Sequence, residues 1–129
     1  MTEKTNKIFI SFALKDRSAH DQLLEQLNKE QTKFSFVEMP VKQSWEPSWK
    51  DECRETVRGC DGVIGLVTKN YVRADGQQWE LCCAYDARIP VLLIHGDSDK
   101  LPSKMPEPVG DREIDTWTWP TISSFLNRL

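Results

Sequence analysis

The chain has 129 residues, and its 17 lysines and arginines against 20 aspartates and glutamates give a formal net charge of −3 at pH 7. This length suits one domain with a sizeable buried core, so we expect a single domain over 1–129. The slightly acidic balance argues against nucleic acid or an anionic membrane as a partner, and no apolar run approaches the ~20 residues of a membrane-spanning helix. The polar start, MTEKTNK, lacks the apolar region of a signal peptide, and we therefore expect a cytoplasmic protein.

Short apolar runs alternate with helical patterns through the first half of the chain. The first run, KIFISF, is apolar on both faces, as a buried parallel strand is. Behind it, Leu23, Leu24 and Leu27 form a helical stripe, and Ser18 with Asp21 has the spacing of a capping box. In this half we predict strands over 7–12 and 34–37 and helices over 18–30 and 49–58.

The second half continues the same alternation. GVIGLVT is a buried apolar run, and QWELCCAYDARIPVLLI combines a short helix with another buried strand. The proline-rich stretch 95–112 predicts a long surface loop, and Pro120 falls in the first turn of a final helix. Here we predict strands over 62–68, 90–94 and 113–117, the last at a sheet edge, and helices over 77–87 and 119–129.

This alternation predicts an α/β fold, with a central parallel sheet of about five strands and helices on both faces. The crossovers should be right-handed. Ligands of such sheets bind beyond the carboxyl ends of the strands. We therefore place the candidate site among the loops 13–17, 38–49 and 69–80.

Several common chemistries lack their motifs in this sequence. It contains no GxGxxG or GxxxxGK[ST] loop for nucleotide phosphates and no GxSxG turn for a serine nucleophile. The acidic residues that a receiver domain needs after its first and third strands are also missing. The four cysteines include no CxxC pair and lie far from both histidines, so we expect reduced thiols and no metal site.

Three stretches carry the most specific pattern: IFISFALKD at 8–16, GVIGLVTKNYV at 62–72 and WELCCAYDARIPVLLI at 79–94. In order and spacing they resemble three parts of the Toll/interleukin-1 receptor (TIR) domain family. These parts are the opening strand and turn, the central strand with its loop, and the glutamate-bearing helix with the proline-led strand after it. The resemblance spans nearly the whole chain and implies a flavodoxin-like TIR fold.

Within this family, Trp79 directly before Glu80 is similar to the stand-alone bacterial TIR-like proteins of antiphage defence, such as the sensor subunits of Thoeris systems. One departure is Gly76, which stands where many relatives have a tryptophan. The resemblance implies an enzyme that cleaves the nicotinamide–ribose bond of NAD, with Glu80 as the catalytic group. NAD would be the substrate, with no separate cofactor, and the product a linear, cyclic or transferred ADP-ribose.

The charge of NAD explains how one carboxylate can be enough. A glycosidase uses two carboxyl groups because its leaving alkoxide must be protonated. Nicotinamide in NAD is already cationic and leaves as a neutral base. The enzyme then has to stabilise an oxocarbenium-like ribose, which a carboxylate beside the ribose hydroxyls does by charge and hydrogen bonding.

The other expected contacts follow from the chemistry of the dinucleotide. A flat cationic ring needs an aromatic face, which Phe12, Trp45 or Trp49 would supply, with Trp79 beside the carboxylate. The pyrophosphate needs backbone N–H groups at a helix start, so we expect it near 13–18, where Ala13, Leu14 and Lys15 are the candidate contacts. Arg17 and Lys50 are further candidates for phosphate contacts, although both, like Asp16, also suit a solvated surface.

Two other functions stay open from the sequence. The chain could be a TIR scaffold that assembles through its 38–49 loop without turnover, with Glu80 a favourable charge in the first turn of a helix. A nucleoside deoxyribosyltransferase-like enzyme fits less well, because the turn Phe12-Ala13-Leu14 lacks the expected glycine. For the enzyme, the resemblance implies self-association on activation and an effector reached through a diffusible nucleotide.

Overall fold

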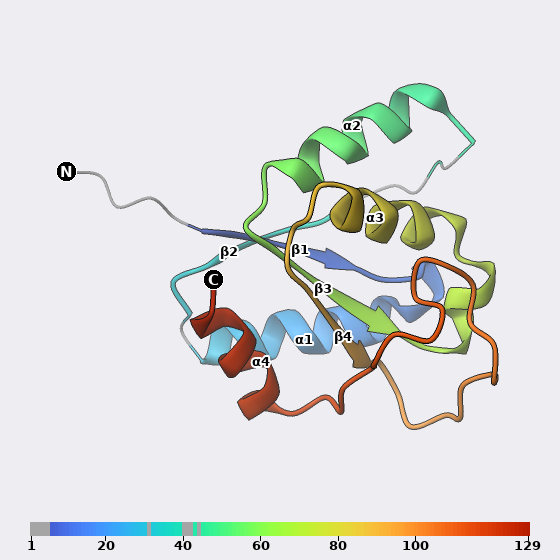
Figure 1. Ribbon diagram of the computed structural model, residues 1–129. Helices are drawn as coiled ribbons and strands as arrows, with labels where there is room; N and C mark the ends of the chain where they lie inside the picture. Colours follow the sequence, from blue (N-terminus) through green and yellow to red (C-terminus); the bar gives the residue numbers. More distant parts are fainter. Residues whose placement is uncertain (1–5, 31, 40–42, 44) are drawn as a thin grey trace.

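The computed structural model describes residues 6–30, 32–39, 43 and 45–129. Within them, a parallel sheet runs in the order β2-β1-β3-β4 (Figure 1). Its strands are β1 (Lys7–Ser11), β2 (Ser35–Val37), β3 (Gly62–Val67) and β4 (Val91–His95). Every paired neighbour is parallel, which confirms the expected α/β fold with one strand fewer than the five anticipated.

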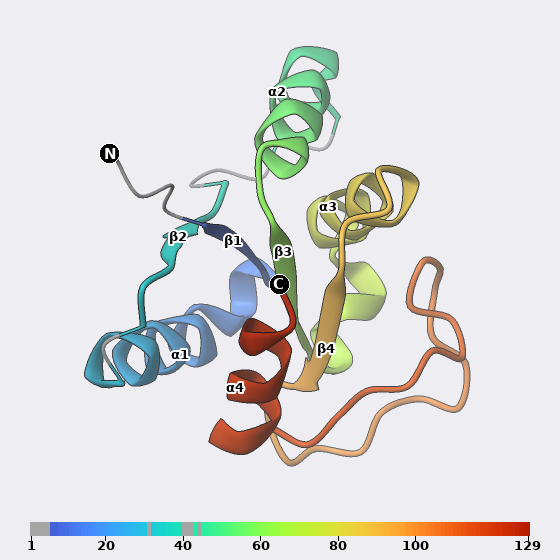
Figure 2. The same ribbon diagram turned by 60° about the vertical axis from the view of Figure 1, so that its left-hand side comes forward.

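Helices cover both faces of the sheet, as Figure 2 shows from the side. On one face lie α2 (Pro47–Arg58) and α3 (Asp75–Asp86), and on the other α1 (Arg17–Lys29) and α4 (Trp119–Asn127). Two short 3-10 helices, η1 (Leu14–Asp16) and η2 (Lys69–Arg73), follow β1 and β3. No helix in the described part of the chain is long and apolar enough to cross a membrane.

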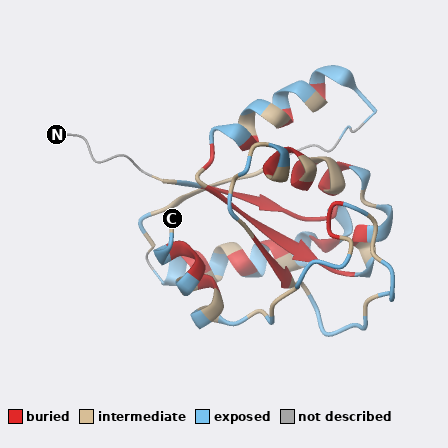
Figure 3. Ribbon diagram, viewed as in Figure 1, coloured by how far each residue is buried: buried red, intermediate tan, exposed pale blue. Residues whose placement is uncertain are grey.

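Alternation along each strand divides the core into two layers. In β1, Phe9 packs with residues of α2 and α3, whereas Ile8 and Ile10 pack with residues of α1 and α4. In β3, all residues are buried, because both of its faces are covered and it has a strand on either side. Figure 3 shows this buried sheet between helices whose outer sides are exposed. The apolar runs of the sequence therefore correspond to strands that contact both layers.

The start of α1 differs from the prediction. The helix begins at Arg17, directly after η1, so Ser18 lies inside it rather than at its N-cap. Asp16 occupies the N-cap position but makes no side-chain cap hydrogen bond. Its carboxylate instead accepts hydrogen bonds from Thr68 and Asn70, across the strand ends. The predicted capping box of Ser18 and Asp21 is therefore wrong, because the helix already begins at Arg17 and its N-cap residue, Asp16, bonds long-range partners instead.

The expected fifth strand over 113–117 reduces to a single parallel bridge between Ile94 and Asp115. His95 N–H donates to the Asp115 carbonyl at 3.0 Å, and Asp115 N–H donates to the Leu93 carbonyl at 2.8 Å. Beyond the bridge, the Trp117 indole N–H donates to Gln26 Oε1 on α1 at 2.9 Å. The segment thus leaves the sheet edge for the α1 face before a second pair of ladder bonds forms.

Tyr71 fastens the long loop after β4 to the core. Its side chain is buried, and its hydroxyl donates to the Pro106 carbonyl at 3.0 Å while accepting from Val109 N–H at 3.2 Å. Val109 is also buried, so the loop contributes to the core although it lies far from η2 in sequence. Burial is the main cause that raises the pKa of Tyr71 to about 12.

We expect Tyr71→Phe to lower the free energy of unfolding by about 1–3 kcal/mol, because the Pro106 carbonyl and the Val109 N–H lose a buried partner. Urea unfolding of both proteins measures the change. The half-buried Tyr85 gives a matched control, and Tyr85→Phe should cost clearly less. Equal costs for the two variants would contradict the proposed role of the Tyr71 hydroxyl.

Because the pKa of Tyr71 is raised, the stability difference between the native protein and Tyr71→Phe depends on pH. The folded state favours the protonated hydroxyl, so this stabilisation is complete below pH ~10 and is lost as the pH rises toward 12. The stability difference between the native protein and Tyr71→Phe should therefore shrink over that interval.

Candidate functional site

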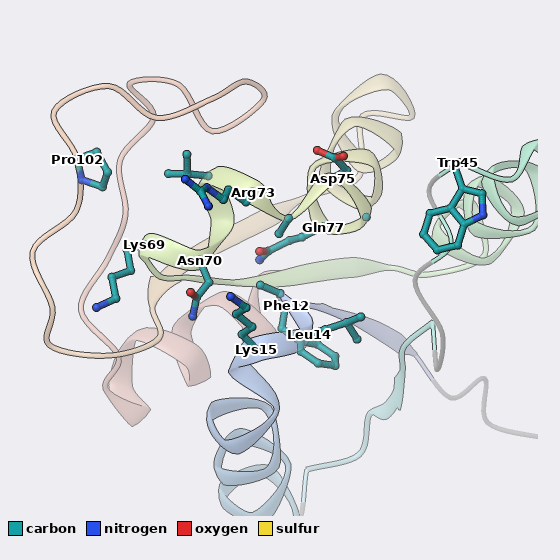
Figure 4. A pocket seen from close by; sticks show the side chains of 14 residues that line it. Phe12, Leu14, Lys15, Trp45, Lys69, Asn70, Arg73, Asp75, Gln77 and Pro102 are labelled. Carbon is teal, nitrogen blue, oxygen red and sulfur yellow. The ribbon is translucent and has the colours of Figure 1, made fainter.

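A cavity of about 690 Å³ opens beyond the carboxyl ends of β1 and β3 (Figure 4). Its volume is in the range of pockets that hold organic ligands, ~300–1,000 Å³. Figure 4 shows Trp45 and Pro102 on opposite sides of the view, with the ends of the strands between them. The lining residues are Phe12, Ala13, Leu14, Lys15, Trp45, Lys69, Asn70, Val72, Arg73, Ala74, Asp75, Gly76, Gln77 and Pro102.

The cavity lies where the sequence placed the candidate site. It joins the 13–17 and 69–80 loops, because β1 and β3 are neighbours and end at the same edge of the sheet. From the 38–49 loop it includes Trp45, whereas 40–42 and 44 lie outside the described residues. Of the expected substrate contacts, the structure brings together Phe12, Ala13, Leu14, Lys15 and Trp45.

Phe12 and Trp45 differ in how open their rings are. Phe12 is fully buried, its ring stacks on His20 with centroids 4.3 Å apart, and the Arg17 guanidinium lies 4.9 Å from its centroid. Trp45 is 72% exposed. Since the ring of Phe12 already has partners within the chain, Trp45 is the aromatic residue with a large open surface at this cavity.

Trp49 and Trp79, the other tryptophans predicted to contact the substrate, are covered largely by neighbouring residues of the chain. Trp49, on the first turn of α2, is 5% exposed and belongs to the core on that face of the sheet. The Trp79 ring lies beneath the side chains of Lys50 and Arg54, and its indole N–H donates to the Lys50 carbonyl at 3.2 Å. Neither tryptophan is among the described lining residues. Trp79 thus joins α3 to α2, and Lys50 is part of that contact.

Glu80 is fully buried, in the second turn of α3 rather than the expected first turn. Ser11 Oγ, at the end of β1, donates to Glu80 Oε1 at 2.9 Å. The carboxylate does not line the cavity, but Gly76 and Gln77, one turn earlier on α3, do. Residues three or four apart lie on the same side of a helix. Glu80 is therefore behind the cavity wall that these residues form.

A second carboxylate, Asp16, is also buried, which corrects its prediction as a surface charge. Thr68 Oγ1 donates to Asp16 Oδ2 at 2.6 Å, and Asn70 Nδ2 donates to Asp16 Oδ1 at 2.7 Å. These bonds join η1 to η2 beside the cavity. Sequence reasoning missed the three residues, although each follows one of two neighbouring strands, and strand ends at one edge of a parallel sheet meet.

Positive charges gather at the cavity, which includes Lys15, Lys69 and Arg73 against the single carboxylate of Asp75. Lys69 pairs with Asp99 at 3.0 Å, and this hydrogen bond is the main cause that raises the pKa of Lys69. Lys15 and Arg73 remain as cations that suit an anionic group such as phosphate. The described residues contain no group of histidine, cysteine and acidic side chains placed to hold a metal ion.

Comparison with known proteins identifies the fold. The model of the TIR domain family matches residues 8–124. Among solved structures, the chain is similar to the TIR domain of the Toll-related Receptor TRR-2 from Hydra magnipapillata, with a TM-score of 0.61 and 11% identity. That likeness covers 94% of this chain and 91% of the other, and at this identity it concerns the fold alone. Comparison with curated proteins found no match.

We expect Asp16→Ala to lower the free energy of unfolding by about 1.5–3 kcal/mol, because two hydrogen bonds to a buried carboxylate are lost. Amide exchange at 68–73 should become faster, since this segment loses its tie to η1. Asp51→Ala, at an exposed carboxylate of α2, is the control and should change stability by less than ~0.5 kcal/mol. Unchanged exchange at 68–73 in Asp16→Ala would contradict the role of the network.

Proposed function

The chain belongs to the TIR domain family, and we propose that it is an NAD nucleotidohydrolase or cyclase that makes an ADP-ribose-derived signal in antiphage defence. The observation that carries the proposal is the placement of Glu80. Its carboxylate is buried, held by Ser11, and one helical turn from residues that line the ligand-sized cavity. A buried carboxylate next to a ligand-sized cavity is a candidate catalytic group, in contrast to a carboxylate on the solvated surface.

The proposed reaction breaks the bond between ribose C1′ and the nicotinamide nitrogen. The electron pair of that bond goes to the ring, so nicotinamide leaves neutral and positive charge develops on the ribose. Glu80 stabilises this charge, and Ser11 fixes the carboxylate that does so. A water oxygen or an acceptor on the adenosine half then bonds to C1′ and releases its proton. NAD is the substrate, and the proposal includes no separate cofactor.

The rest of the dinucleotide fits the remaining lining residues. Trp45 offers its exposed aromatic face to a flat ring, while Lys15 and Arg73 are the cations for the pyrophosphate. The turn at Ala13 and Leu14, directly after β1, lines the same cavity, which supports the proposed backbone contacts to the pyrophosphate. Phe12 supports this turn from within the core rather than stacking openly on the ligand.

Access to Glu80 is the condition for turnover. The carboxylate has no exposed surface in this state, so a substrate reaches it only when part of the cavity wall moves. Leu14, Trp45 and Val72 are the exposed large hydrophobic residues of the described chain, and all three line the cavity. Self-association that covers this apolar rim is the proposed activating step, and the product would reach an effector by diffusion.

The same rim supports a second candidate, a TIR scaffold without turnover. A contact between copies through Trp45 and the 38–49 loop would need no chemistry at Glu80. In that case the Ser11–Glu80 hydrogen bond only fastens α3 to β1. The two functions differ in one measurable respect, namely whether removing the charge of Glu80 changes the fate of NAD.

We expect Glu80→Gln to reduce nicotinamide release from NAD by at least ~10²-fold, the usual loss when one transition-state contact is removed. Glutamine still accepts a hydrogen bond from Ser11, so the fold is retained and circular dichroism should be unchanged. Chromatography of the products, with and without lysate of phage-infected cells, measures the rate. Glu25→Gln, at an exposed position on the opposite face of the sheet, is the control.

Equal release by the native protein and Glu80→Gln would exclude Glu80 as the catalytic group. No release by either protein under any trigger, together with assembly that Trp45→Ala abolishes, would establish the scaffold instead.

A further inference from the structure

The Gln77 side chain holds a fixed orientation at the cavity. It is 1% exposed, and its Nε2 donates to the Ser11 carbonyl at 3.2 Å and to the Leu66 carbonyl at 2.7 Å. Figure 4 shows its amide end pointing from α3 toward the strand ends. Two carbonyl acceptors on one side require the NH₂ group there, because a flipped amide would place three oxygens together. The orientation of the amide is thereby determined by its partners.

The other end of this amide has no partner. Gln77 Oε1 is buried and accepts no hydrogen bond from any described residue, although Gln77 lines the cavity. Folded proteins rarely leave a buried acceptor unpaired, since the desolvated oxygen loses its hydrogen bonds to water. An oriented, unpaired acceptor at a cavity is a preformed position for a donor of the ligand.

We propose that Gln77 Oε1 accepts a hydrogen bond from the carboxamide NH₂ of nicotinamide, which makes Gln77 a specificity-determining residue. The inference rests on the proposed function, because it takes NAD as the ligand. Gln77 selects for an N–H donor on the leaving ring, whereas Glu80 acts on the ribose.

The chemistry of the reacting half of NAD favours this assignment. Its hydrogen-bond donors are the ribose hydroxyls and the carboxamide NH₂. The proposed reaction assigns the hydroxyls to Glu80, which leaves the carboxamide for Gln77. Residues three apart on a helix have Cβ atoms ~5–6 Å apart, a separation similar to that between the ribose and the carboxamide across one pyridine ring. Gln77 stays tied to the strand ends, and a movement of the exposed rim residues Leu14, Trp45 and Val72 that admits the ribose to Glu80 would also uncover the neighbouring amide.

The fixed amide discriminates between ring substituents. A 3-acetylpyridine dinucleotide has a methyl group in place of NH₂ and cannot donate to Gln77 Oε1. A nicotinic acid dinucleotide presents a carboxylate, which is repelled by the amide oxygen. In both cases the buried acceptor stays unpaired beside a bound ligand, which is the situation that makes polar sites reject close analogues.

The test measures binding to the Glu80→Gln protein, in which all ligands stay intact. Titration calorimetry should give an affinity for NAD about ten- to a hundredfold higher than for the 3-acetylpyridine dinucleotide. Adding Gln77→Met, which has a similar length but no amide, should reduce this ratio to within twofold of one. Gln77→Asn is the second variant, since Gln77→Met also loses the donations to Ser11 and Leu66 and stability will fall.

The outcomes separate the inference from the function on which it rests. Equal affinity for NAD and the 3-acetylpyridine dinucleotide, while the native protein releases nicotinamide, overturns the role of Gln77 alone. A preference for NAD that survives in a folded Gln77 variant also overturns it. Absence of both binding and nicotinamide release overturns the proposed function together with the inference. In a ¹⁵N spectrum, a shift of the Gln77 side-chain amide with nicotinamide but not with 3-acetylpyridine would support the inference without any Gln77 variant.

Discussion

A buried carboxylate needs hydrogen-bond donors, and this requirement at Glu80 organises the junction between the sheet and α3. Taking an ionised group out of water is costly unless a partner replaces the lost solvation. Ser11 supplies one such partner from the end of β1. One turn earlier, Gln77 bridges the carbonyls of Ser11 and Leu66 and so joins α3 to β1 and β3. The helix is therefore positioned by polar contacts as well as by the apolar packing of Leu81 and Ala84.

The cavity combines side chains fixed by hydrogen bonds with an exposed apolar rim. Beside the cavity, the Asp16 network holds η1 against η2, and Tyr71 fastens the long loop to η2. In front, Leu14, Trp45 and Val72 expose apolar surface that neighbouring side chains do not cover. The hydrogen-bonded side chains of the Asp16 network and Tyr71 form the fixed part. The residues that would contact a ligand or a second copy of the chain lie at the exposed rim. In the proposed function, movement of the rim residues would therefore open a path for the substrate to Glu80 without displacing the Glu80 carboxylate.

The enzyme and the scaffold interpretations use the same features in different ways. For a scaffold, the buried Glu80 and Gln77 would only support α3, and the unpaired Gln77 oxygen would be a cost without a benefit. For an enzyme, a hydrogen bond from a donor of the bound ligand would offset the free energy lost by the unpaired oxygen. The unpaired acceptor, the cations Lys15 and Arg73 and the adjacent carboxylate together favour a ligand-binding function for this edge of the sheet.

From the sequence alone, the four strands of the sheet and the edge that holds the candidate site could be predicted. Runs such as GVIGLVT are short, apolar on both faces and rich in β-branched residues, which is typical of a strand covered on both sides. It also singled out Glu80 and the turn after β1, because their spacing is typical of a family. Only the tertiary structure shows that the Asp16 side chain bonds Thr68 instead of capping α1, that Trp79 joins α3 to α2, and that the fifth strand is a single bridge. In each case a partner distant in sequence determines the role of the residue, and only the folded chain brings that partner within bonding distance.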